Sequence, residues 1–149
     1  MKLRYATALL LGSFAIARVA IPAHALCAAV TLDEDFKKST AVIVGRAVAQ
    51  RVATTPTPSW PRATETTFEV EAVWKGAPEK TVQIQTCGGI VGQEEIICGE
   101  GFRFVVGSRY VVFADGRPLT TDACHHTALG ERAQQTLQWL SKKPQKKGG

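Results

Sequence analysis

Four cysteines carry the clearest chemical signal in this chain of 149 residues, and they lie at Cys27, Cys87, Cys98 and Cys124. Zinc sites built from cysteine need closely spaced pairs such as C-x-x-C, and the spacing here contains none. An even number of cysteines is typical of disulfide bonds formed in an oxidising compartment. We therefore predict two disulfides, with no metal site and no cofactor. Spacing alone leaves every pairing of the four cysteines open.

The other residues of types that bind metals or act in catalysis are not arranged along the sequence in a way that suits either role. His125 and His126 are adjacent, and neighbours in an extended segment point to opposite sides, so we do not expect them to bind one ion. The same geometry argues against Glu94 and Glu95 as a catalytic carboxylate pair. No serine lies in a nucleophile-elbow motif. The sequence therefore predicts no enzyme, and we expect the two histidines to be loop residues beside a disulfide.

Residues 1–25 have the features of a secretory signal peptide. Basic residues precede an apolar run from Tyr5 to Ala17, and Ala23-His24-Ala25 supplies the small residues at which signal peptidase cleaves. The apolar run is too short to cross a bilayer, and Leu26 does not suit the position before a lipid-modified cysteine. We expect a mature chain that begins at Leu26, is secreted or periplasmic, and has no stable membrane insertion.

The basic character of the chain lies mostly at its ends. The full sequence has a formal charge of +5, but three basic residues lie in the predicted signal peptide and four lysines lie in 142–149. Residues 26–141 keep eleven basic against thirteen acidic residues. Nucleic-acid-binding proteins usually carry positive charge on the folded surface, so we expect no nucleic-acid partner. Residues 142–149 are predicted to be a basic, disordered tail.

The periodicity of residues 26–141 predicts a mostly β domain. Thr31 is suited to cap a short helix over Leu32–Phe36, and a second helix is expected over 128–141, capped by Thr127. Its apolar stripe comprises Leu129, Ala133, Leu137 and Leu140. Strands are expected over 41–53 with a bulge or bend at Gly45-Arg46, over 67–74 and 82–86, and more weakly over 95–98. Segments 102–106 and 109–114 are expected to form a hairpin or a sharp corner.

Short strands of regular spacing beside one longer helix favour a small β-barrel. We predict a five-stranded, OB-fold-like Greek-key barrel with a short N-terminal helix and a C-terminal helix. The proline-rich segment 54–62 is expected to be an exposed loop. Within it, Trp60 could serve as a recognition anchor or pack against the barrel.

The order of motifs along nearly the whole mature chain resembles the inhibitory domain of tissue inhibitors of metalloproteinases and their bacterial relatives, which are netrin-like OB-fold domains. The motifs that carry the resemblance are Cys27, Leu32–Phe36, Ala41–Val48, Phe68–Gly76, Cys98-Gly99, Gly107–Phe113, Leu119-Thr120 and Cys124. The resemblance implies an OB-fold barrel and a secreted or envelope metalloprotease, or another protein, as the partner.

The resemblance also implies where a partner would be contacted. In that family the mature chain begins Cys-x-Cys, and the α-amino group and carbonyl oxygen of the first cysteine chelate the zinc of the protease. Here Cys27 matches the second cysteine, Leu26 the middle residue, and Ala25 the first. The candidate protease-contacting edge is therefore Leu26, Cys27 and Ala28. The zinc-chelating cysteine is missing, which argues against protease inhibition.

The missing cysteine also affects the disulfides that the resemblance implies. Cys98 loses its usual partner, while Cys87 has no obvious counterpart in the family and can replace it. We therefore expect Cys27 to pair with Cys124, and Cys87 with Cys98. Three function classes stay open: a secreted protein-binding module, an OB-fold that binds nucleic acid or glycan, and a structural or ligand-binding protein of the periplasm or envelope.

Overall fold

The computed structural model describes residues 27–76 and 79–146, so the predicted signal peptide and Leu26 lie outside the described residues. The elements in chain order are α1 (Leu32–Lys38), β1 (Ala41–Val52), β2 (Thr64–Lys75), β3 (Thr81–Thr86), β4 (Gly89–Val91), β5 (Glu94–Ile96), β6 (Arg109–Ala114) and α2 (Gly130–Leu140). The prediction of a mostly β chain with a short N-terminal and a C-terminal helix is confirmed. Neither of the described helices is long and apolar enough to span a membrane.

The strands form two antiparallel sheets in the described part of the chain. The larger sheet has the order β3-β2-β1-β6, and β4 and β5 form a separate hairpin. Strand β1 bends where its register with β2 shifts between Val44 and Gly45, which confirms the bend expected there. A Cβ atom at Gly45 would lie 2.7 Å from the carbonyl oxygen of Glu69, so this close approach of the two strands requires glycine.

Hydrogen bonds from segment 119–121 link the two outer strands of the larger sheet. The backbone N–H of Gln85 in β3 donates to the oxygen of Leu119 at 2.8 Å, and Thr121 donates back to Gln85 at 3.0 Å. At the end of β6, Asp115 and Thr120 exchange two backbone hydrogen bonds of 2.8 Å each. The segment therefore lies between β3 and the end of β6.

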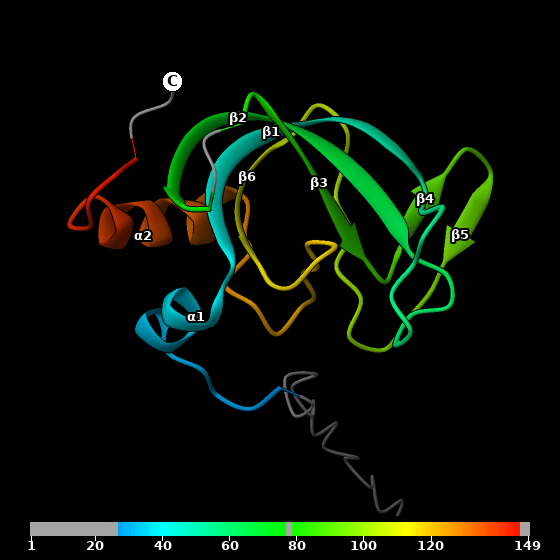
Figure 1. The fold of residues 1–149 in the computed structure, drawn as a ribbon, viewed down its shortest axis with the longest axis horizontal. Helices are drawn as coiled ribbons and strands as arrows, with labels where there is room; N and C mark the ends of the chain where they lie inside the picture. The colour runs from blue at the N-terminus through cyan, green and yellow to red at the C-terminus, as the bar shows by residue number, and fades with distance from the viewer. Residues whose placement is uncertain (1–26, 77–78, 147–149) are drawn as a thin grey trace, which may run out of the picture.

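Alternating residues of β1 separate the core into two clusters, as expected for a strand buried on both faces. Ile43 and Ala47 belong to a cluster with a nest of aromatic rings, in which Phe104 lies 4.9 Å from Phe68 and 4.9 Å from Tyr110 in edge-to-face contact. The opposite face of the sheet is covered by apolar residues of α2 and α1, which lie at the end away from β4 and β5 (Figure 1). The main members of this second cluster are Val42, Val44, Val111, Phe113, Ala133 and Leu140.

Local signals set the start of α1 but not the start of α2. Thr31 forms the expected cap as part of a capping box with Glu34. The prediction that Thr127 caps the second helix is wrong, because its hydroxyl instead exchanges hydrogen bonds with the backbone N–H and oxygen of Phe113. Helix α2 begins at Gly130 without a side-chain cap, and Leu129 before it is 50% exposed instead of buried in the apolar stripe.

Residues 102–106 do not form the strand that their aromatic and β-branched composition predicts. Phe104 is buried, but the backbone of this segment bonds to side chains instead of to a neighbouring strand. The hydroxyl of Thr86 bonds both the N–H and the oxygen of Phe102, and the N–H of Val105 donates to the hydroxyl of Tyr110 at 2.8 Å. These hydrogen bonds and the burial of Phe104 therefore hold this segment in place without a neighbouring strand.

Lys143 and Lys146, in the segment predicted to be a disordered basic tail, make contacts with the rest of the chain. Lys143 Nζ lies 2.9 Å from the carboxylate of Asp33 and 4.4 Å from the centroid of the Trp139 ring. The backbone N–H of Lys146 donates to the oxygen of Val73 at 2.8 Å. Residues 142–146 therefore pack against α1, α2 and β2, and 147–149 lie outside the described residues.

Candidate functional site

The segment before α1 is attached to the rest of the chain by a disulfide. Cys27 is bonded to Cys124 with a Cα–Cα distance of 5.3 Å, which is the pairing expected from the resemblance. Ala28 and Ala29 are exposed, and residues 28–31 have neither helical nor strand structure. The disulfide therefore attaches Cys27 and the adjacent Ala28, two residues of the candidate protease-contacting edge, to the rest of the folded chain. Leu26 lies outside the described residues.

The segment that carries Cys124 lies against the loop that follows Cys98. The backbone N–H of Ala123 donates to the oxygen of Glu100 at 3.0 Å, and Asp122 Oδ1 accepts from the N–H of Cys124 at 2.8 Å. Residues 27–30, 98–100 and 122–124 therefore form one continuous surface, which we call the N-terminal edge.

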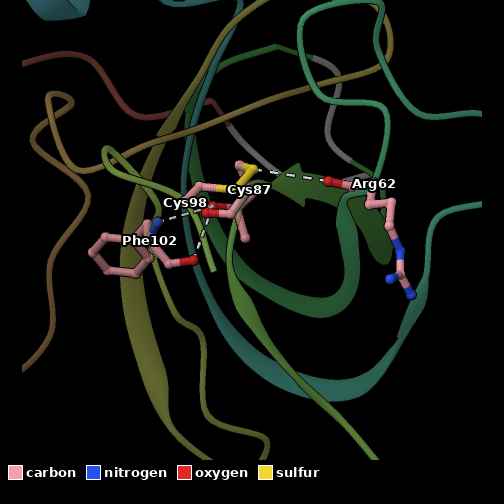
Figure 2. The surroundings of a disulfide bond; sticks show 5 residues. Arg62, Cys87, Cys98 and Phe102 are labelled. Carbon is pink, nitrogen blue, oxygen red and sulfur yellow. Dashed lines mark hydrogen bonds between the residues drawn. A yellow bond between two sulfur atoms is a disulfide. The ribbon is translucent and has the colours of Figure 1, made fainter. Parts of the chain in front are cut away.

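The second disulfide holds the other end of this loop. Cys87 and Cys98 are bonded with a Cα–Cα distance of 5.8 Å, again the expected pairing. Figure 2 shows the sulfur of Cys87 directed at the carbonyl oxygen of Arg62, at 3.8 Å. Gly101 packs so closely that a Cβ atom there would overlap the carbonyl oxygen of Cys87. The bond therefore closes the base of the β4–β5 hairpin, beside Arg62 of the proline-rich loop.

A hollow of about 440 Å³ opens beside this disulfide, and Trp60, Arg62 and Ile97 are among the residues that line it. Trp60 is half-buried, so it packs beside the bonded cysteines as well as facing the hollow. Ile97 is 74% exposed and Ile90 is 55% exposed. These exposed aliphatic residues were not singled out from the sequence, because a short strand pattern does not reveal which face is covered.

Glu94 and Glu95 separate into two ion pairs, with Arg62 and Arg103 respectively. The two carboxylates are therefore not brought together as an acid–base pair. Among residues 27–76 and 79–146, no three His, Cys, Asp or Glu side chains converge to hold a metal ion.

The two histidines meet at one buried carboxylate, contrary to the sequence prediction that they diverge. Asp35, which is 3% exposed, accepts from His125 Nδ1 at 2.8 Å, from His126 Nδ1 at 2.9 Å and from the backbone N–H of His126 at 2.6 Å. The chain turns at 123–125 instead of running extended, and this bend allows both rings to reach the same group. No local sequence pattern signals this contact, because Asp35 lies 90 residues before His125.

The contacts at Asp35 shift two pKa values in opposite directions. Burial alone would raise the pKa of Asp35, but the hydrogen bonds from His125 and His126 outweigh it and hold the pKa below its usual value. The hydrogen bond to Asp35 raises the pKa of His125 despite the opposing effect of burial. These hydrogen bonds therefore tie α1 to the segment that carries Cys124.

The sequence matches no protein-family model and no curated protein. The features that bear on function are thus the N-terminal edge with its two disulfides, the hollow beside Trp60, and the cluster of Asp35 with two histidines. Each of them can bind or hold a protein segment, whereas none of them brings a nucleophile to a base in the described part of the chain.

Proposed function

We propose that this chain is an exported protein-binding module, similar to the inhibitory domain of tissue inhibitors of metalloproteinases, that contacts an extracytoplasmic protein through its N-terminal edge. The observation that carries the proposal is the Cys27–Cys124 disulfide, which fixes an exposed segment against the domain. Two disulfides in the structure are consistent with an oxidising compartment outside the cytoplasm.

An OB-fold-like barrel belongs to the same proposal. The strand order β3-β2-β1-β6 supports it, as do the hydrogen bonds by which segment 119–121 links the outer strands. The bend of β1 at Gly45 supports it further, because strongly curved strands are needed to close a small barrel. In this arrangement the barrel is rigid and holds the N-terminal edge in a fixed position.

Rigidity is what makes the N-terminal edge suited to binding. A loose terminal segment must be ordered when it binds, and the lost freedom of each immobilised side chain weakens affinity. Here the Cys27–Cys124 bond, the hydrogen bond between Ala123 and Glu100, and the histidine contacts of Asp35 fix the segment beforehand. A partner therefore meets a surface that is already formed.

Zinc chelation is not part of the proposed binding. A catalytic zinc keeps one coordination position open, and an amine with its neighbouring carbonyl could occupy it. In the proposed mature chain that amine belongs to Leu26, which has no disulfide of its own and is anchored only through Cys27. The chelating group would have to be ordered on binding, at a cost in affinity.

We therefore expect the mature, disulfide-bonded protein to give no stoichiometric inhibition of a zinc endopeptidase such as thermolysin. Acetylation of its terminal amine should leave any weak inhibition unchanged, because the amine does not reach the metal. The measurement is a titration of protease activity with acetylated and unmodified protein side by side. Tight inhibition that disappears on acetylation would show a zinc-directed inhibitor and refute this part of the proposal.

A further inference from the structure

A groove of about 380 Å³ lies between the start of α1, the histidine segment and the first turns of α2. Leu32 and Ala128 contribute apolar surface, and the polar side chains that line it include His126, Arg132 and Gln135. No acidic side chain is among its lining residues. His125 also lines the groove and directly follows Cys124, so the groove adjoins the N-terminal edge.

Two side-chain donors that line this groove, Arg132 and Gln135, have no acceptors in the described part of the chain. The guanidinium of Arg132 forms no hydrogen bond or ion pair there, whereas Arg51, Arg62, Arg103 and Arg109 each pair with a glutamate. The side-chain amide of Gln135 likewise has no partner among residues 27–76 and 79–146. The hydroxyls of Thr127 and Thr136, by contrast, are engaged with Phe113 and the backbone of Arg132.

Asp35 fixes the orientation of His126 without competing for a ligand. Its carboxylate accepts a hydrogen bond from Nδ1 of the ring. Because Asp35 is buried and its oxygens accept from both histidines, it is not available as an acceptor for Arg132. The unpaired arginine therefore faces a groove without a counterion from this chain.

We propose that this groove binds the carboxylate of an acidic side chain on the protein partner, with Arg132 as its main ligand and Gln135 as a further donor. A planar guanidinium matches a carboxylate through two parallel hydrogen bonds. The apolar contributions of Leu32 and Ala128 suit the methylene groups of a glutamate or aspartate. This binding site adds the chemistry of the partner to the proposed function. It rests on that function only in assigning the carboxylate to a protein partner.

The test uses short peptides, so that it does not depend on finding the natural partner. The disulfide-bonded protein is titrated with N-acetylated triglutamate amide, triglutamine amide or inorganic phosphate, while NMR follows the side-chain resonances of Arg132, Gln135 and His126. We expect saturable shifts with triglutamate and none with triglutamine. Arg132→Gln should weaken triglutamate binding by about tenfold, since it removes a charge-assisted, two-bond contact.

Arg117→Gln is the matched control, because Arg117 is exposed, likewise unpaired among the described residues, and lines a different hollow from the one that Arg132 lines. It should leave triglutamate binding unchanged. Equal weakening by both variants would mean that net charge alone attracts the peptide, and would overturn the inference. Phosphate that binds more tightly than triglutamate at the same resonances would overturn the carboxylate assignment. Either failure would leave binding at the N-terminal edge intact, which is measured separately.

Discussion

Replacing both Cys27 and Cys124 by serine is expected to lower the free energy of unfolding by about 4 kcal/mol, the largest change expected from removing either disulfide. The bond closes a loop of 97 residues, and a disulfide stabilises mainly by restricting the unfolded chain, more so for a longer loop. Urea denaturation of the oxidised wild type and the double variant, followed by circular dichroism, measures the difference.

The matched control for this experiment is the Cys87→Ser, Cys98→Ser double variant, whose loop spans only 11 residues. Its loss should be smaller, about 3 kcal/mol or less, because the shorter loop restricts fewer unfolded conformations. A control variant that loses more stability than the Cys27 variant would contradict the view that the N-terminal segment is fixed chiefly by its long-range bond.

Asp35→Asn is expected to lower the free energy of unfolding by about 3 kcal/mol at mildly acidic pH, because it leaves donors without a charged acceptor in a buried position. The wild-type protein should also lose folding stability in two pH ranges, one above and one below the mildly acidic range, and the variant should lack both of these losses. The pKa of His125 is raised from 6.5, so its contribution is full below 6.5 and disappears as the pH rises through the higher folded value.

The loss of stability at acidic pH runs in the opposite direction, because it increases as the pH falls. The pKa of Asp35 is lowered from 3.8, so its contribution is full above 3.8 and disappears as the pH falls through the lower folded value. The pair therefore stabilises the protein most between 3.8 and 6.5. Denaturation at a series of pH values measures the profile. Asp33→Asn, on the same helix but exposed and paired with Lys143, should leave the loss of stability above pH 6.5 unchanged, because the lowered pKa of Asp33 acts only at acidic pH. A wild-type profile equal to that of Asp35→Asn would contradict the account.

Features set by neighbouring residues could be predicted from the sequence. Thr31 and Glu34 are three residues apart, so the capping box at α1 is a local pattern. The bend of β1 is marked by a glycine within a run of β-branched residues. The disulfide pairing followed only from the resemblance, because spacing left the alternatives open.

Features that depend on distant partners could not be predicted in the same way. Nothing near residues 102–106 shows that their backbone bonds to Thr86 and Tyr110 instead of to a strand. The histidine pair looks divergent in an extended chain, and only the folded chain brings Asp35 to both rings. Lys143 and Lys146 look like a solvated charge run until their contacts with Asp33 and Val73 are known. In each case tertiary contacts overrode a local pattern.

The proposed contact between the N-terminal edge and an extracytoplasmic protein can be tested by site-specific photo-crosslinking. The mature protein carries p-benzoylphenylalanine either at Ala28, on the edge, or at Glu69, an exposed position on β2, and is irradiated with the extracytoplasmic proteins of the producing organism. We expect one dominant protein product from the Ala28 probe, suppressed by excess unlabelled wild type but not by excess Cys27→Ser, Cys124→Ser variant. The absence of any competed product, or the same product from the Glu69 probe, would contradict the account.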